Sequence, residues 1–298
     1  METIRVFVIR ENKIGIQTIR KYIPGEYYPS FEPAYENLVF TDDMNSADIF
    51  IIINNPPQHS CPAERVIYYK TEPDEFYYVP HYWLKPWVEK ESKFFPMDEK
   101  HPRIQTWDLH KDWTTLFRDN FRDKHWLMQV VTTNYGDGTQ VEQQLSGHIA
   151  RMKFLKKFLD NHGYRKDVWR LWGRRLENYH YPVNFGEIYD KFDALWDSKY
   201  TFAFMNSVQP GFFDEKVTDA ILCNCMPIVY GCPNLEQILP EHSFIRLDIT
   251  KEDAVDKAWD LINSDYYEKH KDALGEAKKL ILNKLSIIPR LHHDIGRI

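Results

Sequence analysis

Long apolar segments are missing from this chain of 298 residues. No run of 18 or more apolar residues occurs, and charged side chains interrupt the opening segment METIRVFVIRENK early. The sequence therefore contains neither a predicted membrane-spanning helix nor the apolar region of a signal peptide. We expect a soluble, cytoplasmic protein without an integral membrane segment.

Cysteine is also scarce, because the chain contains only Cys61, Cys223, Cys225 and Cys232. Four cysteines in a chain of this length do not make a disulfide scaffold, which favours reduced thiols. A metal site built from Cys223, Cys225 and Cys232 is conceivable, but their spacing is not that of a zinc ribbon. We therefore expect small buried core residues at these positions and predict no metal site.

An excess of positive charge is absent as well. Lys and Arg number 38 and Asp and Glu number 44, which gives a net charge of −6. This balance argues against a protein whose main task is to neutralise nucleic-acid phosphates. Aromatic residues, by contrast, make up 15% of the chain. Many lie in polar surroundings, as in YYKTEPDEFYYVPHYW and YHYPVNF, where rings with polar tips suit sugar or base faces as well as ordinary cores.

The chain is longer than one compact unit usually is, so two domains with a cleft between them are expected. Short β-branched runs predict strands at 4–10, 48–54 and 65–72. They indicate an N-terminal α/β domain over residues 1–124. The Pro- and aromatic-rich segment 24–37 is predicted to be a surface loop of the kind that lines a site.

A second alternation of strands and helices begins near residue 125. The predicted strands are 125–134, 168–175, 199–206, 226–231 and 243–249, and the predicted helices include 144–163 and 252–265. This alternation indicates a doubly wound parallel sheet whose ligand lies beyond the carboxyl ends of its strands. We assign residues 125–270 to a C-terminal domain, and residues 271–298 to a helix and tail that could cross back to the first domain. Two such sheets facing across a cleft would form a GT-B architecture of two Rossmann-like domains, an analogy of fold alone.

The segment NSVQPGFFDEKVTDAIL contains the turn from the third of these strands into a helix. Asp214 is predicted to cap this helix by accepting hydrogen bonds from the free N–H groups of its first turn. Two interpretations are compatible with the residues that follow. Glu215 and Lys216 could belong to an ordinary capped surface helix, or they could contact the ribose and diphosphate of a ligand at the positive end of the helix.

A resemblance favours the second interpretation. Residues 199–249, KYTFAFMNSVQPGFFDEKVTDAILCNCMPIVYGCPNLEQILPEHSFIRLDI, look like the donor-binding core of family 10 glycosyltransferases, the α1,3/4-fucosyltransferases. That core combines a strand ending in Phe-Glu-Asn-Ser, a helix opened by Glu-Lys, a Pro-(Ile/Val)-(Val/Tyr)-x-Gly strand and Ser-Phe-Ile. The positions that the resemblance assigns to donor nucleotide and donor sugar are Asn206, Ser207, Gly211, Phe212, Glu215 and Lys216.

The resemblance extends outward to two further segments. HIARMKFLKKFLDNHG is similar to a family helix that begins with an arginine, which implies that Arg151 binds phosphate oxygens through its guanidinium fork. VWRLWGRR looks like the family strand ending in Tyr/Phe-Gly-(Arg/Lys), which implies that Trp172, Gly173 and Arg174 lie near the guanosine. For Arg174, an ordinary surface arginine is an equally acceptable interpretation.

Glu72 is the predicted catalytic base. It ends an apolar strand and precedes Pro73, so its carboxylate is expected at the edge of the first sheet, facing the cleft. RVIYYKTEPDEF also resembles the family strand that runs into Glu-Ser-Pro or Glu-Pro. Transfer with inversion requires a carboxylate there to take the proton of the acceptor hydroxyl. Asp74 and Glu75 compete for the role, and a solvated acidic turn is the remaining alternative.

Two departures from the usual pattern matter for chemistry. Met205 stands where the family usually has Glu, which leaves open whether the donor is GDP-fucose, another GDP-sugar or UDP-xylose. No Asp-x-Asp motif follows a strand, so Lys and Arg are expected to neutralise the diphosphate without a metal ion or other cofactor.

The resemblance thus implies an inverting, metal-independent glycosyltransferase that transfers L-fucose from GDP-fucose to a glycan hydroxyl in an α1,3-type linkage and releases GDP. Its expected partners are the nucleotide sugar and an oligosaccharide acceptor, with no nucleic acid. The alternatives are the same enzyme class with another donor, and a non-catalytic glycan-binding module. Because Golgi-resident relatives look membrane-anchored, a bacterial or viral origin is expected.

Overall fold

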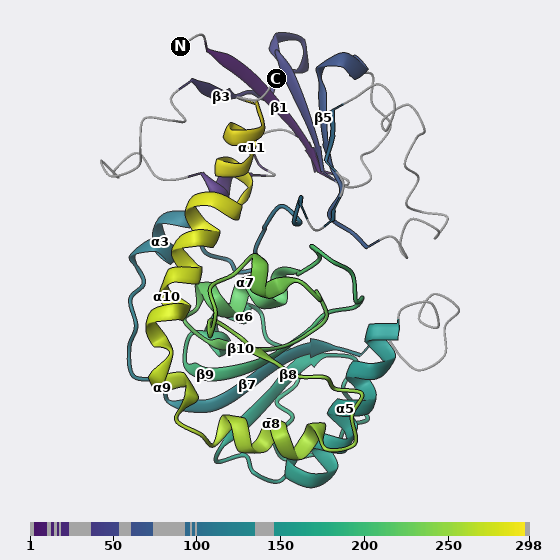
Figure 1. Ribbon diagram of the computed structural model, residues 1–298, viewed down its shortest axis with the longest axis vertical. Helices are drawn as coiled ribbons and strands as arrows, with labels where there is room; N and C mark the ends of the chain where they lie inside the picture. The colour runs from purple at the N-terminus through teal and green to yellow at the C-terminus, as the bar shows by residue number, and fades with distance from the viewer. Residues whose placement is uncertain are drawn as a thin grey trace.

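Two β-sheets of mainly parallel strands, one from each half of the chain, form the framework of the computed structural model (Figure 1). The structure describes residues 3–10, 13–14, 17, 19–23, 37–53, 61–73, 93–95, 97–98, 100–134 and 146–295. Most of the loop predicted at 24–37, together with Asp74 and Glu75, lies outside these residues.

The N-terminal sheet has the strand order β2-β1-β4-β5-β6, and β3 pairs with β1. Its strands are β1 (Ile4–Arg10), β2 (Lys13–Ile14), β3 (Leu38–Phe40), β4 (Ile49–Ile53), β5 (Val66–Tyr69) and β6 (Lys93–Phe95). All pairings are parallel except that between β1 and β2. Strands β1, β4 and β5 confirm the predictions made from their β-branched runs. Apolar side chains cover both faces of this sheet, as parallel sheets require.

The C-terminal sheet has the order β11-β10-β9-β7-β8, and every pairing in it is parallel. Its strands are β7 (Trp126–Thr133), β8 (Trp169–Arg174), β9 (Ser198–Phe204), β10 (Met226–Tyr230) and β11 (Ile245–Arg246). All five strands were predicted from the sequence. Because the strands are parallel, their carboxyl ends meet at one edge, where the ends of β7 and β9 are neighbours.

Helices connect the strands and cover the C-terminal sheet. They are α3 (Trp113–Arg118), α5 (Ser146–His162), α6 (Lys191–Leu195), α7 (Glu215–Leu222), α8 (Ala254–Ile262), α9 (Tyr266–Lys269), α10 (Lys271–Leu280) and α11 (Ile287–Ile295), with a π-helical turn at Ile281–Leu285. Short 3-10 turns occur at Arg20–Tyr22, Met44–Ser46, Ala63–Arg65 and Leu235–Gln237. Helices α5 and α8 confirm the two predicted long helices. None of the helices in the described ranges is both long and apolar enough to cross a membrane.

The C-terminal helices return to the first sheet. Figure 1 shows α10 running up one side of the molecule and α11 continuing beside the N-terminal sheet. The hydroxyl of Tyr69 at the end of β5 donates a hydrogen bond to Asp294 Oδ2 over 2.9 Å, and Arg290 Nε lies 3.0 Å from the same oxygen. Burial raises the pKa of Tyr69 well above its usual value, and the Asp294 carboxylate raises it further. The tyrosine therefore stays a hydrogen-bond donor to this buried acid.

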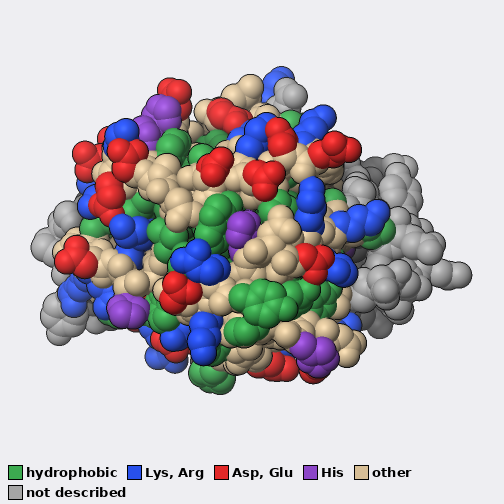
Figure 2. Space-filling model, turned by 90° about the horizontal axis from the view of Figure 1, so that it is seen from below, with side chains coloured by type: hydrophobic (Ala, Val, Ile, Leu, Met, Phe, Trp, Pro, Cys, Tyr) green, Lys and Arg blue, Asp and Glu red, His purple; other side chains and the backbone are tan. Residues whose placement is uncertain are grey.

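One cluster of buried apolar side chains extends through both halves. The segment that joins the sheets adds large aromatics to it: Trp107 packs edge-on against Tyr22 with ring centroids 4.4 Å apart, and Trp113 donates to the carbonyl of Leu282. All four cysteines are buried and free, as predicted for core residues. Burial raises the pKa of Cys225 to about 12. On the face seen in Figure 2, acidic and basic side chains are interspersed, so neither sign dominates there.

Candidate active site

Arg151 on α5 joins the ends of two adjacent strands. Its Nη1 donates to Asn206 Oδ1 over 3.1 Å, just after β9, and its Nη2 donates to the carbonyl of Thr133 over 3.2 Å, at the end of β7. His148 Nδ1, one helical turn before, accepts from Nη2 at 2.8 Å. Only 5% of Arg151 is exposed. The structure therefore brings the predicted phosphate ligand and Asn206 together at the carboxyl edge of the sheet.

Two glycines make this close approach possible. A Cβ on Gly147, in the first turn of α5, would lie 2.3 Å from the carbonyl oxygen of Asn206. A Cβ on Gly231, after β10, would lie 2.9 Å from Met205 Cβ. Met205 is fully buried between these backbones. Its side chain packs in the main cluster of buried apolar residues.

The first turn of α7 concentrates charge. Asp214 caps the helix, as predicted, by accepting from the backbone N–H of Lys216 over 3.1 Å. The Lys216 ammonium lies 2.6 Å from Asp214 Oδ2 and 3.4 Å from Glu215 Oε1. Of the Lys216 side chain, 18% is exposed. The predicted anion site is therefore a compact ion cluster at a helix N-terminus.

The pKa shifts in this cluster follow from burial and from opposite charges. Burial lowers the pKa of Lys216 and Arg151 lowers it further, but the carboxylates of Asp214 and Glu215 raise it above its usual value. Burial raises the pKa of Glu215, but Lys216, Lys191 and Arg103 together bring it below its usual value. Lysine and glutamate are therefore both charged at neutral pH.

A second ion network joins α7 to α6 and to the segment before α3. Lys191 at the start of α6 contacts Asp108 at 3.0 Å and the fully buried Asp219 at 3.2 Å. Asp219 also accepts from the N–H of Asp108 over 2.8 Å. Burial raises the pKa of Asp219 to about 7, although Lys191 opposes this shift. The network holds the segment before α3 against α6 and α7.

The predicted guanosine segment forms the end of β8. Trp172 donates its indole N–H to Gln129 Oε1 over 2.8 Å and packs against Phe185. Gly173 has φ of 154°, and a Cβ there would lie 1.7 Å from the carbonyl oxygen of Thr132. This backbone approach is sufficient reason for glycine at that position. Arg174 is exposed. A role for any of the three in base recognition stays a prediction.

The loop before α7 is tightly packed in this structure. Ser207 and Phe212 are 1% and 2% exposed. Gly211 has φ of 74°, donates its N–H to Asn234 Oδ1 and accepts the N–H of Arg103 at its carbonyl. A Cβ on Gly211 would lie 2.1 Å from the carbonyl oxygen of Asp98. Close packing against the segment that contains Asp98 therefore accounts for Gly211, whose N–H is bonded to Asn234. Contact of Ser207, Gly211 and Phe212 with a donor stays a prediction.

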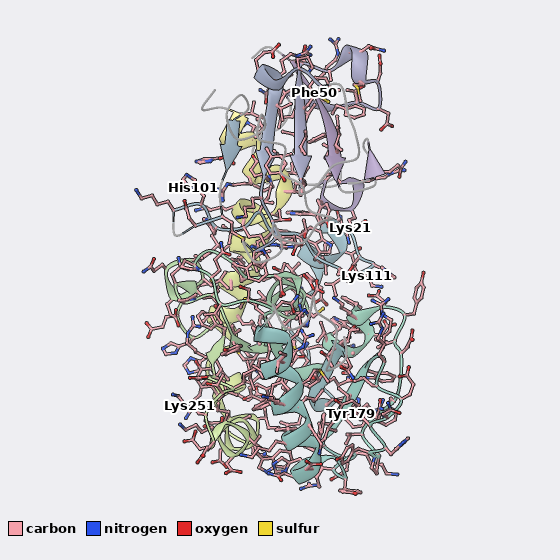
Figure 3. All side chains as sticks on the ribbon, turned by 90° about the vertical axis from the view of Figure 1, so that its right-hand side faces the viewer. Lys21, Phe50, His101, Lys111, Tyr179 and Lys251 are labelled. Atoms are coloured by element: carbon pink, nitrogen blue, oxygen red, sulfur yellow. The ribbon has the colours of Figure 1, made fainter. Side chains whose placement is uncertain are left out.

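Glu72 lies three residues after β5 and is half-buried, between the buried residues Thr71 and Pro73. The carbonyl of Thr71 accepts a hydrogen bond from Arg103 Nε over 2.9 Å. Arg103 also bonds Gly211, so two hydrogen bonds connect the neighbour of Glu72 to the loop before α7. Figure 3 labels His101 and Lys111 at the level where the two halves meet, and both belong to the same connecting segment.

Sequence reasoning missed Gly147, His148, Arg103 and Gln105. Gly147 and His148 sit in the helix that was assigned through Arg151, and a glycine in the first turn of a long helix was an available signal. Arg103 and Gln105 lie in a charged, aromatic stretch without periodicity. The side chain of Arg103 bonds a residue 32 positions away and that of Gln105 a residue 113 positions away, which no local pattern reveals.

A family model described as "Glycosyltransferase family 10 (fucosyltransferase) C-term" matches residues 168–261, about a third of the chain. This match confirms, for residues 168–261, the resemblance to glycosyltransferase family 10 that the sequence predicts. The family 10 segment spans β8 to β11 and includes α7 with Glu215 and Lys216, whereas Arg151, Glu72 and Arg103 lie outside it. It lies entirely in the C-terminal half of the chain. No curated protein matches the sequence.

Solved structures give the fold. "Crystal Structure of Glycosyltransferase from Rickettsia africae ESF-5" is 8% identical, covers 100% of this chain and 98% of its own, and has a TM-score of 0.51. "Crystal Structure of alpha1,3-Fucosyltransferase" is 13% identical, covers 93% of this chain and 82% of its own, and has a TM-score of 0.46. The two parallel sheets, linked by a C-terminal helix that returns to the first, form a GT-B fold, which confirms the prediction.

Proposed function

We propose that the protein is an inverting glycosyltransferase that transfers L-fucose from GDP-fucose to a hydroxyl group of a glycan. The observation that carries this proposal is the ion cluster at the start of α7, inside the family 10 segment and beside Arg151. Lys216 and Arg151 bring positive charge to this end of the helix, and they lie close enough for Arg151 to lower the pKa of Lys216. Both side chains can attract a diphosphate.

The proposed mechanism assigns one task to each side of the cleft. Glu72 takes the proton of the acceptor hydroxyl, whose oxygen forms a bond to the anomeric carbon of fucose from the face opposite the diphosphate. The bond from that carbon to the phosphate oxygen breaks with its electron pair, and the configuration inverts. Arg151 and Lys216 stabilise the negative charge that develops on the departing GDP. Glu215 accepts hydrogen bonds from donor hydroxyls.

We further propose that neither a metal ion nor a cofactor is required. In the described part of the chain, His, Cys, Asp and Glu do not form a group of three or more that could hold a metal ion. The cations named above supply charge where other transferases use a divalent ion. The buried position of Met205 gives no reason to prefer a donor other than GDP-fucose.

The test is turnover with a defined donor. The purified chain is incubated with GDP-fucose and a panel of oligosaccharides, with and without EDTA, and GDP release and fucosylated product are measured. GDP release that depends on an acceptor and persists in EDTA is the expected result. Calorimetry with GDP is run in parallel, and absence of GDP binding would contradict the proposal. Turnover with UDP-xylose or another GDP-sugar in place of GDP-fucose would correct the donor.

A further inference from the structure

The segment between β6 and α3, described at residues 97–98 and 100–112, is called the linker here. It is fixed to both halves of the molecule. Gln105 is fully buried, donates to the carbonyl of Arg103 over 2.7 Å and accepts from the hydroxyl of Thr218 on α7 over 2.8 Å. Its own N–H donates to the carbonyl of Leu285 over 2.9 Å. Hydrogen bonds thus hold the linker against α7 and the C-terminal helices.

Arg103 connects the linker to both sides of the proposed site. Its backbone N–H donates to the carbonyl of Gly211 over 2.9 Å, and its Nε donates to the carbonyl of Thr71 over 2.9 Å. Its backbone carbonyl is held by Gln105. Glu72 directly follows Thr71, so Arg103 is one residue away from the proposed base and in direct contact with the loop before α7.

The burial of Arg103 indicates a role beyond surface charge. It is 7% exposed, and its Nη1 is buried with no hydrogen-bond partner among the residues that the structure describes. A buried guanidinium nitrogen without a partner costs free energy. Attraction to Glu215, whose pKa Arg103 lowers, offsets part of this cost, and the Nε is aimed at one specific carbonyl, that of Thr71.

We propose that Arg103 is a positioning residue that sets the distance between the Glu72-bearing end of β5 and the donor loop around Gly211. The proposal rests on the proposed function for the role of Glu72. A GT-B cleft separates base and donor onto different domains, so their separation depends on contacts between the domains. A misplacement of about 1 Å can lower turnover by about 100-fold, which makes such a contact important for rate.

Two substitutions separate hydrogen bonding from charge. In Arg103→Gln the side-chain amide nitrogen occupies the place of Nε and can still donate to Thr71, but the charge is gone. In Arg103→Met the length is kept and both donor and charge are lost. We expect kcat to fall by about 100-fold in Arg103→Met and by less than about fivefold in Arg103→Gln, with the KM for GDP-fucose little changed in both. Arg165→Met, which removes an exposed arginine paired with Asp167, is the control and should retain full turnover.

A third variant keeps the charge and moves the donor. Arg103→Lys places its ammonium one atom further along the side chain, so it should resemble Arg103→Met in kcat. If Arg103→Lys retains full turnover while Arg103→Gln loses it, charge is what matters and the positioning role is wrong. If Arg103→Gln and Arg103→Met both weaken GDP binding about tenfold or more, Arg103 is a phosphate ligand, which also overturns the proposal.

A measurement without substrate separates this inference from the proposed function. Amide hydrogen exchange is followed in the peptide covering residues 66–73, which contains β5 and Glu72. Faster exchange in Arg103→Met, with the wild-type rate in Arg103→Gln, supports the positioning role even if no sugar is transferred by any variant. Unchanged exchange in Arg103→Met overturns it even if the wild type is an active fucosyltransferase. Thermal unfolding of each variant shows whether the chain is folded, and Arg103→Gln carries the test if Arg103→Met is not.

Discussion

The ammonium group of Lys216 lies 2.6 Å from the carboxylate of Asp214, the residue that caps the same helix. A cation held by the cap of its own helix is fixed in place before any ligand arrives. It therefore loses little side-chain entropy when an anion binds, which is the usual cost of using a lysine. This arrangement makes the first turn of α7 the most direct place to test donor binding.

Lys216→Met should weaken GDP binding by about 10- to 100-fold, because it removes a charge-assisted contact worth about 1.5–3 kcal/mol and leaves Asp214 and Glu215 repelling the diphosphate. Calorimetry with GDP measures the effect. Lys251→Met is the matched control, since Lys251 is 67% exposed and Figure 3 labels it in the lower part of the C-terminal half. Equal GDP affinity in the two variants would exclude Lys216 as a ligand.

Glu72→Gln should lower kcat by about 100- to 10,000-fold while GDP affinity stays at its wild-type value. The amide has the shape of the carboxylate but cannot take a proton from the acceptor. Steady-state kinetics and calorimetry are needed together. A variant that turns over normally would transfer the role of base to another acid, and a wild type with no turnover to lose would favour the glycan-binding module.

Gly211→Ala should destabilise the fold by roughly 3 kcal/mol or more, because it combines an unfavourable positive φ with a collision against the Asp98 carbonyl. Gly186→Ala is the control for φ alone. Gly186 has φ of 78°, and a Cβ there would meet nothing within 4 Å. It should lose only about 1 kcal/mol. Urea unfolding of both variants measures the difference, and equal losses would mean that the linker yields at Asp98.

The stability of the chain should fall in mild acid in a way that depends on His162. Its ring stacks on Trp259 with centroids 3.9 Å apart, and burial lowers its pKa, as does Arg165, while Asp256 opposes the shift. A histidine whose pKa is lowered on folding binds fewer protons in the folded state. Its contribution to stability is therefore complete above the unfolded value of about 6.5 and is lost as the pH falls below that value.

The measurement is urea unfolding of the wild type and His162→Gln at several pH values between about 7.5 and 5. Relative to the variant, the wild type should lose free energy of unfolding as the pH falls. Comparison with the variant cancels the contributions of the other titrating groups. A constant difference across this range would show that His162 takes up its proton equally in both states.

The strands and the cap were predictable because their signals are local. β1, β4 and β9 are short runs of buried apolar residues, and Asp214 precedes an apolar helix at the position that a cap requires. The packing of the site was not predictable in the same way. The resemblance assigns Gly211 to the donor site, and the structure shows that the linker at Asp98 packs against it, which the sequence did not indicate. Close approaches between distant segments leave a glycine in the sequence without indicating what lies against it.

The hydrogen bond between Tyr69 and Asp294 joins residues 225 positions apart. During synthesis on the ribosome, the hydroxyl of Tyr69 therefore cannot form this hydrogen bond until almost the entire remaining chain has been made. Contacts of such long range are formed late in folding and slow it. We therefore expect the first sheet to depend on the C-terminal helices for its final form, so that the two halves of the chain complete folding together.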